Sequence, residues 1–291
     1  MTISIDLELA WGIWDKPSND YFGRCAELET HIVESLLSMF DRHGVTATWA
    51  FVGRLLDRAP SFPVKTDHGE KIWYAPHLID SIREARTEQE LGSHSFEHVY
   101  FGTIDRQAAR ADLDAARAVH ARHGIEFRSF VFPRNQVAHV DLLGEVGLRV
   151  FRSVDVGWFM AAGRLGPAAG MAANLLDKML AVPPSVVEAR RRGGTVELPS
   201  STLLLGRNGL RRLVRPSAVV VKHALGLRAA RAARRVFHLW FHPSNFYYET
   251  ERQLGVLERV LEFAAGMRDK GEIDIVPMSH FGGAYVHSSP P

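Results

Sequence analysis

Two histidines four residues apart are the first residues of this chain that could do chemistry together. His94 and His98 lie within residues 89–101, directly after a short apolar segment that reads as a strand. If residues 95–98 form a helical turn as the chain leaves that strand, the two imidazoles lie on one face. Neutral imidazole is the commonest protein ligand for zinc-type metal ions. The spacing therefore predicts that the pair chelates one metal ion, and the alternative is a pair of ordinary polar loop residues.

The spacing alone is a weak signal, because the chain has 14 histidines and a second pair with this spacing occurs at His238 and His242. That pair falls in a segment that reads as a strand. Residues four apart in a strand are separated by roughly 13 Å, at ~3.3 Å per residue. His238 and His242 are therefore not expected to share a metal ion.

The elements that must position such residues follow a regular alternation. Short apolar, β-branched segments alternate with amphipathic segments, which predicts repeated βα units on a parallel sheet. We expect strands just before His94 and at residues 3–9, 45–51, 127–132, 148–154, 195–198, 236–241 and 273–276. We expect helices at residues 26–43, 76–86, 106–123, 140–146 and 249–267, with a longer irregular stretch at 159–192.

Reactive residues recur at the carboxyl ends of these strands, where a parallel βα barrel places its chemistry. Besides His94 and His98, these ends carry Asp6, Glu8, Arg134, Asn135, Asp155 and His242. Alternation along a strand puts Asp6 and Glu8 on the same face. We therefore expect one shared site at this rim. The structural alternatives are a capping or turn role for Asp6, a surface position for Asp155 and a strand histidine at His242.

Length and composition favour one globular domain over residues 1–291. The chain has 291 residues, 46% of them hydrophobic and 23% charged, which is within the range of a single α/β barrel. A single cysteine, Cys25, suits a reducing compartment. The first residues lead into a strand without the features of a signal peptide, and no apolar stretch reaches the ~18 residues of a membrane span. We expect a cytoplasmic protein, with peripheral contact at the inner membrane face as an option.

Charge is distributed unevenly along the chain. Residues 199–248 contain no Asp or Glu and nine cations, so that a net charge of +2 for the whole chain leaves −7 for the remainder. This asymmetry predicts an anionic partner. Arg228, Arg231, Arg234 and Arg235 fall opposite an apolar stripe at helical spacing, formed by Ala218, Val221, Leu225, Ala229, Ala232 and Val236. Two interpretations stay open, a solvated helix face and a contact with an anionic membrane surface.

These motifs resemble the polysaccharide deacetylase (NodB-homology) family of carbohydrate esterases. Glu90-Leu-Gly-Ser-His-Ser-Phe-Glu-His98 is similar to the family's His-Ser/Thr-x-x-His metal motif with its usual lead-in. Val45-Thr-Ala-Thr-Trp-Ala-Phe-Val-Gly53 resembles the second strand, and Phe237-His-Leu-Trp-Phe-His242-Pro resembles the final histidine motif. The matches run from Ile3 to about Phe281. The resemblance implies a single deformed (β/α) barrel.

The resemblance also implies an activity, the metal-dependent hydrolytic N-deacylation of an acylated amino sugar in glycan or lipid-linked saccharide biosynthesis. N-deacetylation is the form that we expect. One divalent ion, zinc or another transition metal, would be held by Glu8, His94 and His98, and it would activate water and polarise the amide carbonyl. Asp6 would then act as the base, His242 as the acid that protonates the amine, and Asp155 would orient His242.

Three departures from the family pattern affect the assignment of residues. Asp6-x-Glu8 replaces the usual pair of adjacent aspartates, which leaves open which carboxylate binds the metal. The arginine of the family's Arg-x-Pro-Tyr motif is missing, and Arg134 is the candidate to replace it, ahead of Arg128. The Asp-Trp motif is reduced to Asp155-Val-Gly-Trp158.

The remaining predictions concern substrate contacts and competing functions. We expect Trp11, Trp158 and Asn135 to line the substrate pocket, because each lies close to a predicted catalytic residue. A catalytically silent barrel that binds a glycan or lipid-linked sugar is one alternative. A nucleic-acid-binding protein is another, which is disfavoured because no aromatic platform or known motif accompanies the arginines.

Overall fold

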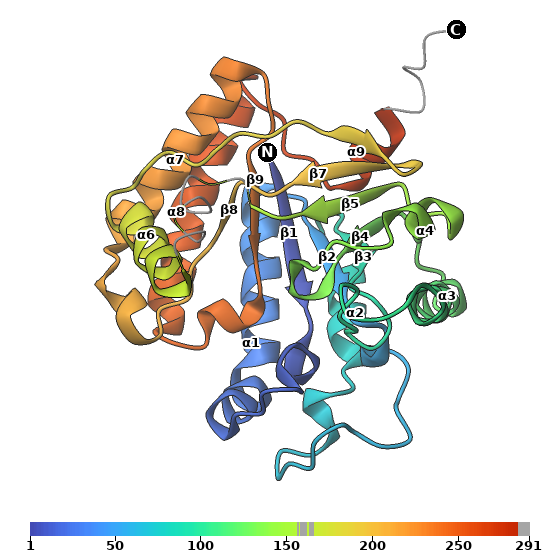
Figure 1. The fold of residues 1–291 in the computed structure, drawn as a ribbon. Coiled ribbons are helices and arrows are strands. Elements are labelled where there is room, and N and C mark those ends of the chain that lie inside the picture. Colours follow the sequence, from blue (N-terminus) through green and yellow to red (C-terminus); the bar gives the residue numbers. More distant parts are fainter. Residues whose placement is uncertain (156, 158–161, 163–165, 285–291) are drawn as a thin grey trace, which may run out of the picture.

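One curled sheet organises the fold. The structure, a computed structural model, describes residues 1–155, 157, 162 and 166–284. Nine strands in these residues pair in the order β6-β7-β5-β4-β3-β2-β1-β9-β8. They are β1 (Thr2–Leu7), β2 (Thr48–Phe51), β3 (Glu90–Ser93), β4 (Ser129–Val131), β5 (Val150–Ser153), β6 (Arg190–Arg192), β7 (Thr195–Pro199), β8 (Thr202–Leu203) and β9 (His238–Phe241). All neighbours are parallel except β6 and β7. The predicted deformed (β/α) barrel is confirmed, as a barrel that is open between β6 and β8 (Figure 1).

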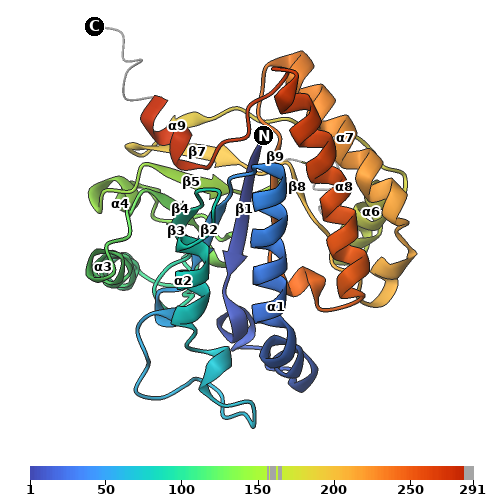
Figure 2. The same ribbon diagram turned by 180° about the vertical axis from the view of Figure 1, so that it is seen from behind.

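Helices surround this sheet. They are α1 (Asn19–His43), α2 (Pro76–Arg83), α3 (Arg106–Arg122), α4 (Val140–Glu145), α6 (Pro167–Met179), α7 (Pro216–Ala233), α8 (Thr250–Asp269) and α9 (Ser279–Ala284). Short 3₁₀ helices are η1 (Leu9–Ile13), η2 (Gly53–Leu55), η3 (Glu70–Ile72), η4 (Pro133–Asn135), η5 (Gly209–Leu213) and η6 (Pro243–Phe246). The view from behind shows α1 beside α8, and α8 beside α7 (Figure 2). Helices α3 and α4 lie on the other side of the molecule.

The core lies between β1 and the helices that cover it. Ile3 and Ile5 of β1 are fully buried, and they belong to one apolar cluster with Leu36 of α1. The side chain of Ser18 accepts the backbone N–H of Tyr21 at the start of α1, as an N-cap does. Gly44 ends α1 with φ +57°, the left-handed C-cap that the sequence predicts.

The register of the strands sets the height of the residues that follow them. Leu7 of β1 pairs with Phe51 of β2, and Phe51 pairs with Ser93 of β3. The next residues along the chain, Glu8 and His94, therefore leave the sheet at the same level. The carboxyl edge of this sheet is the rim on which the predicted site depends.

Two element predictions are wrong. Residues 273–276 form no strand, and instead the backbone N–H of Val276 donates to the carbonyl of Met1 at 3.0 Å. The stretch 159–192, expected to be irregular, contains α6 and β6. Helix α6 is hard to recognise because its sequence lacks the usual polar outer face.

The buried face of α7 also differs from the predicted apolar stripe. Lys222, Gly226 and Leu227 point inward, whereas Val221 of the predicted stripe is 49% exposed. A Cβ added to Gly226 would lie 2.6 Å from the ring of Phe237, so this glycine allows close packing of α7 on the chain before β9. The inward position of Lys222 reverses the face that hydrophobicity alone predicts.

Candidate metal and catalytic site

Glu8, His94 and His98 meet at the rim of the sheet. Oε2 of Glu8 lies 3.2 Å from Nε2 of His94 and 2.9 Å from Nε2 of His98. One ligand atom from each residue lies within 4.8 Å of the others. The two rings are buried, and the glutamate side chain is 11% exposed. The structure therefore brings together the three residues that the sequence predicts as metal ligands.

The loop that carries His98 does not form the expected helical turn. Ser95 and His98 have φ of +67° and +56°, in the left-handed region that such residues rarely adopt. The backbone N–H groups of Gly53 and Arg54 donate to the carbonyls of Ser95 at 3.0 Å and Phe96 at 3.1 Å. A positive φ costs of order 1–3 kcal/mol and persists only when the surroundings impose it. The contact with the end of β2 is one such constraint.

Asp112 of α3 supplies the second constraint on this loop. Its carboxylate is 8% exposed and accepts the backbone N–H of Phe96 at 2.9 Å and of Glu97 at 3.0 Å. Burial raises the pKa of Asp112 to about 6, although these two hydrogen bonds act in the opposite direction. Glu97 also forms an ion pair with Arg54. The two histidine rings are thereby held with centroids 5.0 Å apart.

The protonation states and orphaned atoms of this cluster fit a divalent metal ion. Burial raises the pKa of Glu8, but the neighbouring His242 and His98 outweigh it and hold that pKa well below its usual value. Burial lowers the pKa of His98. An ionised carboxylate and neutral imidazoles are the forms that bind metal.

Nδ1 of His94 lies 2.9 Å from the carbonyl of Val131, a bond that leaves Nε2 free to act as a ligand. Nδ1 of His98 has no hydrogen-bond partner in the described part of the chain, and its Nε2 faces the Glu8 carboxylate at 2.9 Å.

Asp6 is held by an arginine that the sequence analysis missed. Nη1 and Nη2 of Arg152 each lie 2.6 Å from one carboxylate oxygen of Asp6. Burial raises the pKa of Asp6, but the charge of Arg152, with those of His94 and His242, brings it below its usual value. Arg152, and not Arg134, is therefore the arginine that contacts the predicted base. The available signal was a charged residue inside the apolar strand of residues 148–154.

A line of buried polar groups continues behind this ion pair. Nη1 of Arg152 donates to the hydroxyl of Ser4 at 3.1 Å, and this hydroxyl lies 2.9 Å from Nε2 of His238. Nδ1 of His238 lies 3.1 Å from the carbonyl of Pro199. Burial lowers the pKa of His238 to about 3, so its ring is neutral. His238 thus supports Arg152 and takes no part in metal binding, as its position in a strand predicts.

His242 lies on the opposite side of the carboxylates from His94. Its Nε2 is 3.5 Å from Oδ2 of Asp6 and 3.5 Å from Oε1 of Glu8, and its side chain is 22% exposed. The backbone N–H of His242 donates to Oδ1 of Asn245 at 2.9 Å, which fixes the turn into η6. The ring is therefore within reach of both carboxylates and of solvent.

The partner predicted for His242 is placed elsewhere. Asp155 accepts hydrogen bonds from Ser200 at 2.6 Å and from the indole N–H of Trp240 at 2.7 Å. Among the described contacts, none joins Asp155 to His242. The ring of Trp240 contacts both His242 and Arg152. Its centroid lies 5.5 Å from that of the His242 ring, and the guanidinium of Arg152 lies 4.3 Å from the Trp240 ring. Asp155 therefore orients Trp240 rather than the histidine.

The remaining predicted residues are scattered around this centre. Asn135 accepts from Arg152 at 3.2 Å, whereas Arg134 pairs with Asp15 at 3.0 Å. Trp11 is 4% exposed and donates to the carbonyl of Trp73, so it is a core residue and the prediction that it lines the pocket needs correction. Because η1 turns inward, the indole of Trp11 packs within the apolar core. Trp158 lies outside the described residues.

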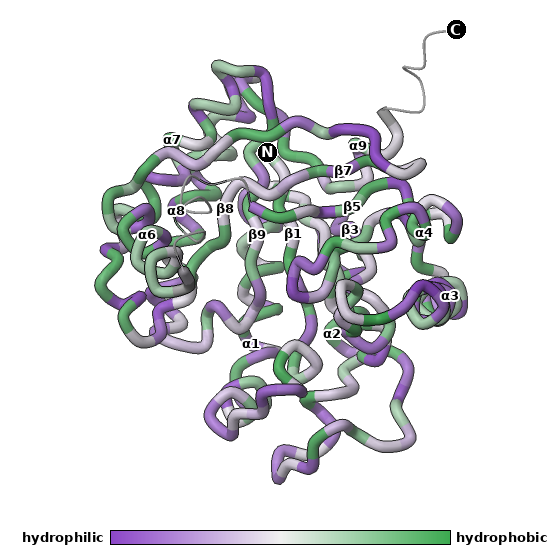
Figure 3. Tube along the Cα trace, viewed as in Figure 1, coloured by the Kyte–Doolittle hydropathy of each residue, from purple (hydrophilic) through white to green (hydrophobic). Residues whose placement is uncertain are grey.

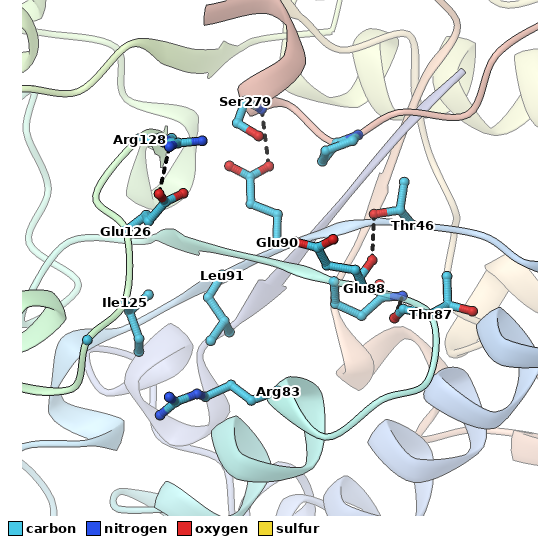
Figure 4. Close-up of a pocket in the computed structure, with 13 residues that line it drawn as sticks. Thr46, Arg83, Thr87, Glu88, Glu90, Leu91, Ile125, Glu126, Arg128 and Ser279 are labelled. Atoms are coloured by element: carbon cyan, nitrogen blue, oxygen red, sulfur yellow. Dashed lines mark hydrogen bonds and ion pairs between the residues drawn. The ribbon is translucent and has the colours of Figure 1, made fainter. Parts of the chain in front are cut away.

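A pocket of about 670 Å³ lies at the amino ends of β2, β3 and β4, away from the rim (Figure 4). Several polar groups that line it are paired with one another. Glu90 accepts the backbone N–H of Ser279 at 3.1 Å, Thr46 donates to the carbonyl of Glu88 at 2.8 Å, and Arg128 pairs with Glu126 at 2.6 Å. These bonds tie the segment before α9 to the sheet.

Comparison with known proteins supports the resemblance found in the sequence. Residues 22–146 match the family model described as polysaccharide deacetylase. A putative polysaccharide deacetylase from Mycobacterium smegmatis has a similar structure, with a TM-score of 0.67 at 17% identity over 100% of this chain and 92% of that chain. None of the curated protein sequences matches this chain significantly.

Two further solved structures share the fold. A Puue allantoinase has a TM-score of 0.64 at 10% identity, over 100% of this chain and 91% of its own. A probable polysaccharide deacetylase from Pseudomonas aeruginosa PAO1 has a TM-score of 0.60 at 12% identity, over 100% of this chain and 91% of that chain. At these identities the likeness establishes the fold alone.

Proposed function

Because residues 22–146 match the polysaccharide deacetylase family model, we propose that this chain belongs to that family and catalyses the hydrolytic N-deacylation of an acylated amino sugar, with one divalent metal ion. The convergence of Glu8, His94 and His98 beside Asp6 carries this proposal. The four side chains come from segments that follow or end β1 and β3, and they meet at one edge. Zinc is the first candidate, because two imidazoles and one carboxylate are ligands that it prefers.

A divalent ion held by these three residues would polarise the amide carbonyl and lower the pKa of water at the site. Asp6 is the residue that removes a proton from the attacking water. Its carboxylate is ionised and held at both oxygens by Arg152, so its position is fixed while the proton moves. The same ion pair prevents Asp6 from turning toward the metal ligands, which favours Glu8 as the ligand and Asp6 as the base.

His242 is the residue that protonates the departing amine. An amide needs this step because an amine anion is a very poor leaving group. Nε2 of His242 faces the carboxylates at 3.5 Å, and the partial exposure of the ring leaves room for a substrate atom beside it. Trp240 and the η6 turn hold the ring from behind.

The proposal is tested by metal analysis of the purified protein together with amine release. The substrates are N-acetylated monosaccharides, N-acetylated oligosaccharides and a lipid-linked N-acetyl sugar. Allantoin serves as an amide substrate without a sugar. We expect one bound divalent ion and release of amine from at least one N-acetylated sugar. Bound metal without release from any sugar would support the silent, glycan-binding barrel instead.

A further inference from the structure

Helix α6 buries its charged residues and exposes apolar ones, the reverse of an ordinary surface helix. Its two charged residues, Asp177 and Lys178, are 2% and 5% exposed, whereas Met171, Leu176 and Met179 are 73%, 50% and 41% exposed. In Figure 3 the trace of α6 lies at the periphery of the molecule and carries hydrophobic residues along much of its length. A surface helix normally buries its apolar stripe and exposes its charges. The outward apolar face of α6 therefore requires an explanation.

Buried ion pairs fix α6 in this orientation. The carboxylate of Asp177 lies 2.9 Å from Nζ of Lys222 in α7 and 3.3 Å from Nζ of Lys178. Lys178 donates to the hydroxyl of Thr202 in β8 at 3.0 Å. Rotation of α6 to bury its apolar side would leave Lys222 buried without this carboxylate, at a large cost in free energy. The exposed apolar face is thus a stable feature of the fold.

A second segment adds to the same surface. Leu210 and Leu213 of η5 are 72% and 58% exposed. Leu210 and Met171 line one groove of about 590 Å³, which is mostly apolar. We call the exposed apolar residues of α6 and η5 the apolar patch.

Cations accompany the apolar patch without carboxylates from the same segment. Arg211, Arg212 and Arg215 are exposed in and just after η5, within the Asp/Glu-free residues 199–248. The only carboxylate that approaches them among the described ion pairs is Glu249, 4.0 Å from Arg212. The patch therefore combines exposed Leu and Met side chains with a positive border.

The arginines of α7, for which the sequence left a solvated face and a membrane contact open, are partly engaged with carboxylates and an aromatic ring. Arg231 pairs with Glu272 at 3.3 Å, and Arg235 pairs with Glu188 at 2.8 Å. The guanidinium of Arg228 lies 5.4 Å from the ring of Phe263. These contacts with α8 and with nearby segments of the same chain make the α7 face an ordinary surface whose positive charge is partly neutralised. Among the described ion pairs, Arg211 and Arg215 have no carboxylate partner, and neither do Arg228 and Arg234.

We propose that the apolar patch docks the protein onto an anionic membrane surface, with Leu and Met side chains among the headgroups and the arginines on anionic lipids. Contiguous exposed apolar residues are rare on monomeric proteins and mark contact surfaces. Apolar residues with a basic border are the pattern of peripheral membrane contact. A symmetric contact with a second copy would instead bring two sets of arginines together. No described helix is long and apolar enough to cross a bilayer. This inference does not depend on the proposed function.

Flotation with lipid vesicles tests the proposal without any enzyme assay. The full chain is mixed with phosphatidylcholine vesicles or with vesicles that also contain phosphatidylglycerol, at low and high salt. The variants are the pair Met171→Gln and Leu210→Gln, and the pair Arg211→Gln and Arg215→Gln. Arg259→Gln removes the same charge from an exposed position on α8 and is the matched control. All substituted side chains are exposed, so circular dichroism is expected to show an unchanged fold.

We expect binding to phosphatidylglycerol vesicles that weakens with salt, because screening acts within about 8 Å at physiological ionic strength. Each arginine removed at η5 lowers the partition coefficient about fivefold, and the apolar pair lowers it by more than about tenfold. Arg259→Gln binds like the wild type. Equal recovery with both vesicles, or none, overturns the proposal. So does a dimer in light scattering that the Met171→Gln and Leu210→Gln pair converts to a monomer, since it assigns the patch to a second copy.

Discussion

The guanidinium of Arg152 donates hydrogen bonds of 2.6 Å to both oxygens of the Asp6 carboxylate. Arg152 lies in β5 and Asp6 in β1, and β4, β3 and β2 lie between these two strands in the sheet. The ion pair thus crosses the inside of the open barrel. Both side chains are almost completely buried, at 0% and 3% exposure. It joins β5 to β1 and at the same time fixes the predicted base.

Removal of one partner of this pair is expected to destabilise the fold. Arg152→Met leaves the charge of Asp6 buried and unpaired, which lowers the free energy of unfolding by about 3–5 kcal/mol. The double variant Asp6→Asn and Arg152→Met removes both charges and recovers most of that loss. Urea unfolding of the wild type, the two single variants and the double variant measures these differences. An additive loss in the double variant would mean that the two side chains act independently.

Arg152→Lys separates charge from geometry. Lysine keeps the positive charge but presents a single ammonium group instead of the two-pronged guanidinium. We expect a folded protein whose kcat falls while its metal content stays at the wild-type level. Arg134→Lys, which alters an arginine paired with Asp15, is the control and is expected to leave kcat within about twofold, as surface ion pairs contribute little.

Metal content tests the ligand assignment directly. His94→Ala and His98→Ala each remove one of the two imidazoles next to Glu8, and both variants are expected to lose the bound ion. The matched control is His31→Ala, an exposed histidine on α1. Mass spectrometry of the purified proteins gives the metal content per chain. Wild-type metal in both site variants would exclude these residues as ligands.

Acid and base roles predict a loss of activity without a loss of metal. Asp6→Asn and His242→Ala are each expected to lower kcat by about 10²–10⁴-fold, the usual contribution of a general acid or base. Metal content measured on the same samples distinguishes this from a ligand role. Loss of the ion in Asp6→Asn would make Asp6 a ligand, and full activity in His242→Ala would remove the acid from the proposed function.

Asp112 is expected to act on the metal through the loop that it holds. Asp112→Ala leaves the backbone N–H groups of Phe96 and Glu97 without their acceptor, so the loop no longer places His98 beside Glu8. Supporting residues of this kind contribute about 10–100-fold to metal affinity. Competition with a chelator measures that affinity. Asp114→Asn, on the same helix but paired only at the surface, serves as the control and keeps wild-type affinity.

Glu29 makes the stability of the fold depend on pH. This carboxyl of α1 is 4% exposed and accepts the hydroxyl of Tyr247, and burial raises its pKa to about 7 from an ordinary 4.5. The folded protein therefore holds this proton more tightly than the unfolded chain. Its stabilisation is complete below pH ~4.5 and is lost as the pH rises through ~7, by about 3 kcal/mol in total.

Glu29→Gln keeps an acceptor for Tyr247 and removes the titration. We expect the variant to be more stable than the wild type at pH about 8 and to lose that advantage at pH about 5. Urea unfolding at the two values gives the difference. Parallel pH profiles for the two proteins would show that Glu29 keeps an ordinary pKa in the fold.

The sequence predicts the parts of this molecule in which local pattern and position agree. Helix α1 shows apolar residues at helical spacing and a glycine at its end, and the structure has both. Glu8 and His94 could be placed because parallel strands in register must end at one edge. His98 could be predicted to lie near them, but its loop conformation depends on Gly53, Arg54 and Asp112, whose hydrogen bonds no local pattern encodes.

Arg152 and α6 were missed for a related reason, since each departs from the rule that charges lie outside and apolar residues inside. The position of an arginine within an apolar strand can be explained only when a carboxylate on a distant strand is known to face it. A helix with apolar residues outside looks irregular until Lys222 is known to bind its aspartate. In both cases a buried ion pair between distant segments determines the structure, and such pairs leave no periodic signal.

The attachment of α6 through ion pairs also makes its outer face an independent target for engineering. Because Asp177, Lys178 and Lys222 hold the helix from within, exchange of Met171, Leu176 and Met179 for polar residues leaves these buried ion pairs in place. Such a variant should purify and concentrate without detergent or self-association, and it should crystallise with the rim and its ligands unaltered. The exposed face of α6 could therefore be redesigned to change what this protein binds there without a change in its fold.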